Sequence, residues 1–260
     1  MNIKISTNNF NIPKINFKGD DNKKNMTAPK ESKLEKTPQN DTFEMSVGYV
    51  NDEHGQTNNM MRILSGLKGD LRVSAGDNDI GDEKNKAVHR ATMKFMNLAN
   101  ITATALGNHE LDTTQSDLLD SIEDYDGDIL ATNMNQEDVE AEDPKDVEEL
   151  GRAPLAKSLK NSKVVEVKGE KIGLVGASPI DMFDRLTHPN YHTDCSIDAL
   201  EDTIEDIQDE VDKMKEQGIN KIFLLSHLGH QKDQIVAQNT KDIDVIIGGH
   251  THELVKDIKE

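Results

Sequence analysis

A repeated pattern of short apolar runs, each followed by a cluster of polar residues, most constrains how this chain can fold. The runs hold β-branched or other apolar side chains, and such segments predict β-strands. They span residues 45–50, 71–74, 101–106, 128–131, 163–167, 171–176, 221–226 and 243–247. Only residues 168–170 separate two of these runs, which predicts a tight hairpin.

Between several runs lie segments with apolar residues at every third or fourth position. This spacing predicts helices over residues 56–67, 84–99 and 197–217. In the last of these, Ser196 is the expected N-cap and Gly218 the expected residue after the helix end. Strands alternating with helices, with one hairpin inserted, predict a mixed α/β domain whose polar groups collect at strand ends.

The apolar fraction of the 260-residue chain is 34%, which is low for a globular protein. Residues 1–42 are rich in Lys and Asn, show no sustained period and contain Pro13, Pro29 and Pro38. We expect this segment to be a disordered tail, and residues 43–260 to form the folded domain.

The charge of the chain excludes two classes of partner. The net charge is −19, and because residues 1–40 carry a net charge of +4, the remaining residues carry −23. Such a domain repels phosphates, so we expect neither nucleic acid nor a membrane surface as its partner. A small phosphate ester is compatible with this charge only if bound cations reverse its sign locally.

Residues 116–150 are especially acidic, with 14 Asp or Glu side chains against one Lys. The segment lacks the spacing of a calcium-binding loop. We therefore interpret it as a solvated loop or lid, or as a helix with an exposed acidic face.

Cysteine content and hydropathy indicate the cellular setting. The single cysteine, Cys195, excludes an intrachain disulfide and a cysteine-based metal cluster. No apolar run approaches the roughly 20 residues that cross a bilayer. Because no apolar stretch follows the N-terminal Lys residues, the sequence also lacks a recognisable secretory signal, and the default expectation is a cytoplasmic protein.

Five polar clusters follow predicted strands, and six of the nine His residues lie in or beside them. The clusters span residues 51–55, 76–79, 107–112, 226–227 and 248–253, and the six residues are His54, His109, His227, His230, His250 and His252. An Asp-x-His or His-x-His spacing places two ligand side chains on one short loop. Carboxylate and imidazole without thiolate suit Mn²⁺, Fe²⁺, Zn²⁺ or Mg²⁺, so the clusters predict a metal site.

Taken in order, these clusters resemble the calcineurin-like metallophosphoesterase signature: Asp-x-His, Gly-Asp, Gly-Asn-His-Asp/Glu, His and Gly-His-x-His. The forms Asn-Asp-x-His-Gly, Gly-Asn-His-Glu-x-Asp and Gly-Gly-His-Thr-His-Glu are similar to the 5′-nucleotidase branch of that family. The resemblance covers residues 45–253, which would be the N-terminal catalytic domain alone. It implies a four-layer α/β/β/α sandwich with two mixed sheets.

The resemblance also implies two divalent metal ions, whether Mn, Zn, Fe, Co or Mg. Asp77 matches the carboxylate that bridges them, Asp52, His54 and His252 match ligands of one ion, and Asn108, His227 and His250 match ligands of the other. A shared carboxylate lowers the repulsion between two cations, and two such ions with Asp52 and Asp77 leave a positive site that attracts phosphate.

The resemblance assigns catalysis to two further residues of the third cluster. His109 matches the histidine that contacts the phosphate and assists the leaving-group oxygen, and Asp112 matches the carboxylate that pairs with it. Hydrogen bonding to a carboxylate fixes the tautomer of an imidazole and raises its pKa.

The implied reaction is in-line attack of metal-bound hydroxide on a phosphate ester, most simply a nucleotide monoester in a 5′-nucleotidase-like reaction. The alternatives are hydrolysis of a cyclic nucleotide or other phosphodiester, and a non-catalytic remnant that binds metal or nucleotide. The resembled nucleotidases continue beyond the last histidine motif with further strands and a domain that stacks the base, so we expect the last strands to be missing here. They are also commonly exported, which makes an extracytoplasmic location the second expectation.

Overall fold

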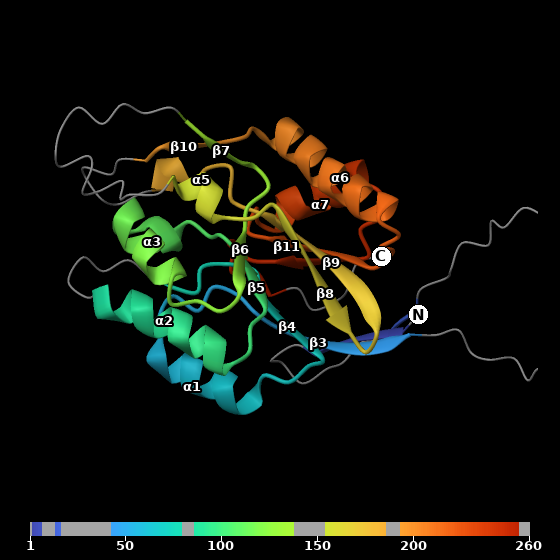
Figure 1. Ribbon diagram of the computed structural model, residues 1–260, viewed down its shortest axis with the longest axis horizontal. Coiled ribbons are helices and arrows are strands. Elements are labelled where there is room, and N and C mark those ends of the chain that lie inside the picture. Colours follow the sequence, from blue (N-terminus) through green and yellow to red (C-terminus); the bar gives the residue numbers. More distant parts are fainter. Residues whose placement is uncertain are drawn as a thin grey trace, which may run out of the picture.

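Two β-sheets packed face to face form the centre of the molecule, and helices cover both outer faces (Figure 1). The computed structural model describes residues 2–6, 14–16, 43–79, 86–137, 154–185 and 193–254. Within these residues, three apolar clusters fill the spaces between the layers. One lies between the two sheets, and one lies between each sheet and the helices on its outer face. The predicted four-layer α/β/β/α architecture is therefore confirmed.

The larger sheet has the strand order β2-β1-β3-β4-β5-β6, and all its neighbouring strands are parallel except β1 and β2. Its strands are β1 (Asn2–Ser6), β2 (Lys14–Asn16), β3 (Glu44–Val50), β4 (Leu71–Ser74), β5 (Ala103–Ala105) and β6 (Asp128–Leu130). Three helices cover its outer face: α1 (Thr57–Gly66), α2 (Lys86–Leu98) and α3 (Gln115–Ile122).

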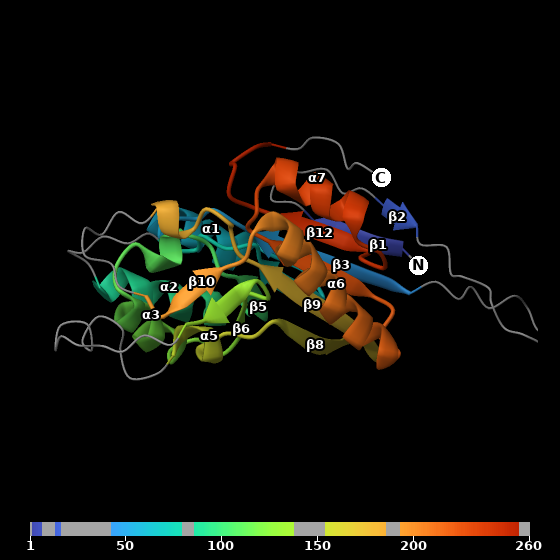
Figure 2. The same cartoon turned by 90° about the horizontal axis from the view of Figure 1, so that it is seen from above.

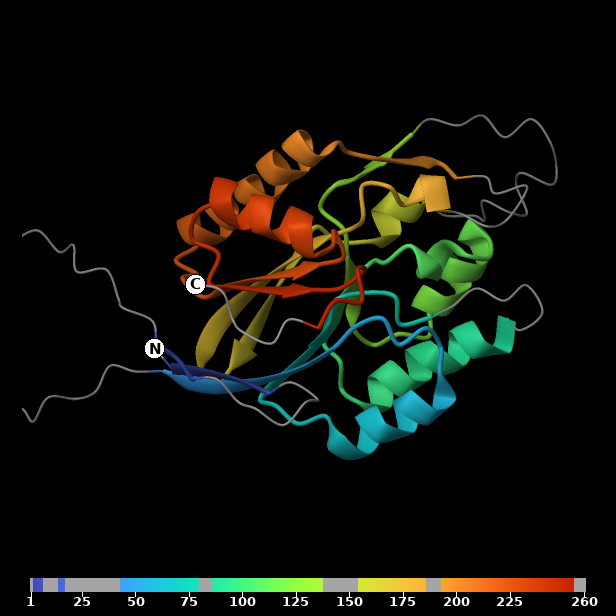
Figure 3. The ribbon, with the colours of Figure 1, turned by 180° about the vertical axis from the view of Figure 1, so that it is seen from behind.

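The second sheet has the order β12-β11-β9-β8, in which only β8 and β9 are antiparallel. Its strands are β8 (Ser162–Val167), β9 (Glu170–Ala177), β11 (Ile222–Ser226) and β12 (Val245–Gly248). The helices α6 (Leu200–Glu216) and α7 (His230–Asn239) cover its outer face, on the opposite side of the molecule from α1–α3 (Figure 3). The remaining described elements are a short ribbon of β7 (Met134–Gln136) and β10 (Cys195–Ile197), the helix α5 (Leu155–Ser158), and two 3-10 helices, η1 (His109–Leu111) and η2 (Phe183–Arg185).

Alternation along β11 shows how one strand serves two layers. Phe223 and Leu225 pack between the sheets, whereas Ile222 and Leu224 pack under α6 and α7. All four are fully buried, because successive side chains of a strand point to opposite faces and both faces are covered here.

The eight predicted strands are all present, with ends within two residues of their predicted bounds. The predicted hairpin is also confirmed: Lys168 and Gly169 join β8 to β9 with φ of +52° and +82°. The predicted N-cap of the long helix is wrong, because Ser196 pairs with β7 as part of β10 and the helix begins at Leu200. Gly218 does follow the helix end, with φ of +79°.

Two segments within the expected disordered tail form strands instead. β1 pairs in parallel with β3, and β2 pairs with β1, which extends the larger sheet (Figure 2). The alternation of Ile3 and Ile5 with polar residues explains this, since β3 offers an open edge to such a segment. The rest of residues 1–42 lies outside the described residues, and the boundary at residue 42 stays a prediction.

The acidic segment 116–150 contains more regular structure than a loop. Its described part, up to residue 137, supplies most of α3 and all of β6 and β7, while residues 138–150 lie outside the described residues. Among the helices that the structure describes, none has both the length and the apolar character needed to cross a membrane.

Asp70 ties the β8–β9 hairpin to β3 of the larger sheet. Its carboxylate accepts hydrogen bonds from Lys168 Nζ at 2.7 Å and from the Ser46 amide at 2.7 Å, and these hold its pKa at about 2. We expect Asp70→Asn to lower the free energy of unfolding at pH 7 by about 0.5–1 kcal/mol, because the pair is partly solvent-screened. Ionised Asp70 stabilises the folded state above the ordinary carboxyl pKa, so the difference should shrink as the pH falls from about 4 toward 2.

Urea unfolding of both proteins at pH 7 and at pH 2.5 measures this difference. An equal difference at the two pH values would contradict the ionic origin of the effect.

Candidate active site

All nine predicted site residues lie just after the carboxyl ends of five strands, drawn from both sheets. Asp52 and His54 follow β3, Asp77 follows β4, Asn108, His109 and Asp112 follow β5, His227 follows β11, and His250 and His252 follow β12. Because parallel strands end at the same edge of a sheet, the polar loops meet there. The strand-end pattern in the sequence therefore indicated the location of the site.

Six of the seven predicted metal ligands form two compact groups. In each group, one ligand atom from every residue lies within 4.8 Å of the others: Asp52, His54 and His252 form one group, and Asp77, His227 and His250 form the other. His252 Nε2 lies 3.3 Å from Asp52 Oδ1, and His227 Nε2 lies 2.9 Å from Asp77 Oδ2. A third group, of His54, Asp77 and His109, connects the two.

Two buried polar atoms at the site suit a cation. Asn108 Oδ1 accepts no hydrogen bond from any described residue, and His227 Nε2 makes none of proper geometry within the same part of the chain. Leaving a buried polar atom without a partner costs about 1–3 kcal/mol. A divalent ion would satisfy both atoms, so the carboxylate, amide and imidazole donors present here fit such an ion.

The backbone at five of these residues is in the left-handed region. The φ angles of Asp52, His54, Asp77, His250 and His252 are +54°, +50°, +51°, +81° and +52°. Such a conformation costs about 1–3 kcal/mol per non-glycine residue, and residues that adopt it cluster at functional sites. Strand-end hydrogen bonds hold it in place, including Asp52 N to Gly76 O and His54 N to Asp77 O, each at 3.0 Å.

His227 is oriented by the main chain. Its Nδ1 donates to the Ala75 carbonyl at 2.6 Å, which leaves Nε2 facing Asp77. When one ring nitrogen of a histidine binds a metal, a hydrogen bond from the other nitrogen fixes the tautomer and the ring plane. Burial lowers the pKa of His227, but the Asp77 carboxylate beside its Nε2 outweighs this effect and raises the pKa to about 9.

His109 differs from the other histidines in its partner. Its Nδ1 is hydrogen-bonded to the Asp112 carboxylate, which raises the pKa of His109 despite partial burial. Its amide donates to Asp77 Oδ1 at 2.9 Å, so Asp77 and His109 are held at a fixed distance from each other. The His109 side chain is 29% exposed and that of Asp112 is 5% exposed. The imidazole is thus open to a ligand while its carboxylate partner is sheltered.

Glu110 is a residue to which the sequence analysis gave no role. It is fully buried and accepts hydrogen bonds from the amides of Asp77, Asn78 and Gly107 at 3.1, 2.7 and 2.8 Å. Burial, followed by the charge of Asp77, raises its pKa to about 7. Glu110 therefore joins the loop that carries Asp77 to the loop that carries Asn108 and His109. The signals for it in the sequence were its position in the third polar cluster and its place in the Gly-Asn-His-Glu motif.

Glycines allow these loops to approach one another. A Cβ added at Gly107 would overlap Asp77 Oδ1 and the Asp77 amide, and one at Gly249 would lie 2.9 Å from His227 Nδ1. A side chain at either position would force apart two ligand-bearing loops.

Asp181, which follows β9, is a second residue that the sequence analysis missed. Its Oδ1 lies 3.5 Å from His250 Nε2. It belongs to none of the five polar clusters, so the sequence contained no signal for its proximity to the site.

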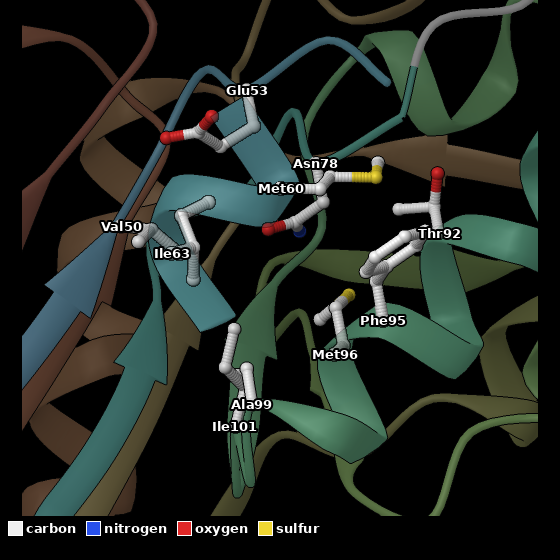
Figure 4. A pocket seen from close by; sticks show the side chains of 10 residues that line it. All are labelled: Val50, Glu53, Met60, Ile63, Asn78, Thr92, Phe95, Met96, Ala99 and Ile101. Carbon is white, nitrogen blue, oxygen red and sulfur yellow. The ribbon is translucent and has the colours of Figure 1, made fainter. Parts of the chain in front are cut away.

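A narrow pocket lies beside the loop that carries Asp52 and His54 but is not part of the two groups (Figure 4). Glu53 and Asn78 line it together with apolar side chains such as Met60, Phe95 and Met96. Its volume of about 20 Å³ is enough for a single water molecule. The pocket is therefore too small to be a substrate site.

The fold and the arrangement of the site residues are those of a metal-dependent phosphoesterase. Comparison with known protein families shows which family of phosphoesterases this is. The chain belongs to the calcineurin-like phosphoesterase family, whose sequence model matches residues 45–254. Among its relatives is the 5′-nucleotidase of Mus musculus, which is 32% identical over 163 residues covering 61% of this chain and 25% of the mouse protein. The chain thus spans about a quarter of the length of that curated relative.

Two solved structures share the fold. A 5′-nucleotidase precursor from Thermus thermophilus has a TM-score of 0.63 at 23% identity, over 82% of this chain and 42% of its own. An NAD nucleotidase from Haemophilus influenzae also has a TM-score of 0.63, at 25% identity, over 81% of this chain and 39% of its own. The site-bearing strands described above lie within the family match.

Proposed function

We propose that this domain hydrolyses phosphate esters at a site that holds two divalent metal ions. Asp52, His54 and His252 would hold one ion, Asn108, His227 and His250 would hold the other, and Asp77 would be shared between them. The observation that carries this proposal is the pair of three-residue groups at one edge of the two sheets. Family membership and the unpartnered Asn108 Oδ1 support it further.

When bound, such ions neutralise phosphoryl charge and make water a better nucleophile near neutral pH. The residues of the chain then supply the remaining functions. His109, kept protonated by Asp112, places positive charge beside the phosphate and gives a proton to the departing oxygen. Glu110 and the close glycines hold the loops at fixed separation.

Nucleotide monoesters are the proposed substrates, on the basis of relatives named as 5′-nucleotidases. An NAD nucleotidase among the structural neighbours favours a second candidate, a pyrophosphate linkage within a dinucleotide. The chain spans only part of these relatives, so a panel of substrates distinguishes the two candidates.

The test is a substrate panel with the purified chain and added Mn²⁺, Zn²⁺ or Co²⁺. It comprises 5′-AMP, a cyclic nucleotide, an aryl phosphodiester and NAD. We expect phosphate release from 5′-AMP that depends on metal and is abolished by a chelator. The control variant is Asp126→Asn, an exposed acid before the amino end of β6, which should retain full activity.

Each other outcome has a distinct meaning. Turnover of the cyclic nucleotide or aryl diester alone would replace the monoesterase proposal with a phosphodiesterase. Turnover of NAD alone would favour the dinucleotide candidate. No metal-dependent turnover of any of the four would indicate a non-catalytic binding domain.

A further inference from the structure

Asp233, a buried acid in the first turn of α7, has no part in the mechanism proposed above. Its side chain is almost fully buried, with 9% of the residue exposed. Burial raises its pKa to about 7, so the fold carries a cost for keeping a carboxyl group there. Its contacts indicate a use for it.

The Asp233 carboxyl group lies between the ends of two neighbouring strands. Ser226 Oγ, at the end of β11, donates a hydrogen bond to Asp233 Oδ1 and accepts one from the Leu228 amide at 3.2 Å. Gly248, at the end of β12, pairs with Ser226, and a Cβ added there would overlap Asp233 Oδ2. The carboxyl group therefore occupies the space that a side chain at position 248 would need.

Both strand ends lead directly into ligand loops. Ser226 immediately precedes His227, and Gly248 precedes His250 by two residues. The Gly249 amide donates to the Ser226 carbonyl at 2.9 Å, which ties the loop after β12 to the loop after β11. The start of α7 also contacts the loop after β12, since the His230 amide lies 3.4 Å from Thr251 Oγ1.

We infer that Asp233 is a positioning residue that sets the separation of His227 and His250. It thereby sets the affinity for a metal ion of the group formed by Asp77, His227 and His250. The inference rests on the two-ion site proposed above. Partners that orient metal ligands typically change affinity 10- to 100-fold when they are removed. Asp233 acts through Ser226 and the strand ends and does not touch the ion.

Titration calorimetry of the metal-free full chain with Mn²⁺ alone tests this. We expect Asp233→Ala and Ser226→Ala each to weaken binding at one of two sites 10- to 100-fold, and the double variant to be no worse than either single one. Asp233→Asn keeps an oxygen acceptor for Ser226 and should stay within about threefold of the wild type. The control is Gln231→Ala, an exposed position in the same turn of α7, which should bind like the wild type.

Melting curves recorded in chelator separate positioning from general stability, with titrations run well below the lowest melting temperature. Unchanged affinity in Asp233→Ala and Ser226→Ala, with a lowered melting temperature alone, would overturn the inference. If Asp233→Ala does not fold, Ser226→Ala and Asp233→Asn decide it in the same way. A wild type that binds two Mn²⁺ ions but hydrolyses nothing would refute the proposed function and leave this comparison intact, whereas binding of fewer than two ions would refute both.

Discussion

Replacing His109 with alanine is expected to lower kcat by about 10²- to 10⁴-fold while the metal content stays the same. The range is that of losing one positioned proton donor. His109 uses Nδ1 for Asp112 and its amide for Asp77, so its imidazole is held beside the two groups. The buried Asp112 carboxylate raises the pKa of His109 and so favours its protonated form. His227, by contrast, uses its Nδ1 for the Ala75 carbonyl of the main chain.

Steady-state kinetics with two kinds of ester provide the measurement. The loss should be larger for 5′-AMP, whose alkoxide leaving group needs a proton, than for an aryl phosphate with an acidic phenol. Elemental analysis of the purified variant gives its metal content. Equal loss of metal and activity would make His109 a ligand, and an equal loss on both esters would assign it to phosphate binding alone.

Asp77→Asn is expected to weaken metal binding at least about 100-fold and to abolish turnover at low micromolar metal. The amide keeps the shape of the side chain and one oxygen, but removes the negative charge that both groups would share. One unit pair 4 Å apart contributes about 4 kcal/mol at an effective dielectric constant of 20, and this loss would apply to both ions.

Calorimetry with Mn²⁺ measures the change, with Asp79→Asn as a demanding control. Asp79 is a buried acid two residues away in the same loop, but it belongs to neither metal group. If both variants lost affinity equally, general disturbance of the loop would explain the result. Recovery of Asp77→Asn turnover at millimolar metal would support a loss of affinity over a loss of chemistry.

The fold and the site differ in how far the sequence determines them locally. Strands could be predicted because buried runs such as residues 71–74 and 221–226 are apolar and β-branched and end in polar residues. Ligand candidates could be predicted because each stands directly after such a run. Their grouping into two sets came from a family resemblance, since spacing along the chain does not say which loops meet in space.

Residues that act through long-range contacts could not be found in this way. Glu110 and Asp233 accept hydrogen bonds from groups that the fold brings to them. Asp233 has no local pattern of its own, and the motif that contains Glu110 does not reveal which amides it binds. Ser196 failed as an N-cap for the same reason: its pairing partner Asn135 is 61 positions away and outweighs the local preference for a cap. The strand at Asn2–Ser6 also depends on pairing with β3, which lies later in the chain and which the local sequence does not reveal.

The origin of the site in both sheets has a consequence for the mechanics of the domain. The first metal group combines side chains from the loops after β3 and β12, and the second combines side chains from the loops after β4, β11 and β12. Otherwise, the two sheets meet mainly through an apolar interface, which resists separation but permits sliding. Ions bound at these loops would act as cross-links between the two halves of the sandwich. Metal supply would then govern the rigidity and lifetime of the folded domain as well as its chemistry.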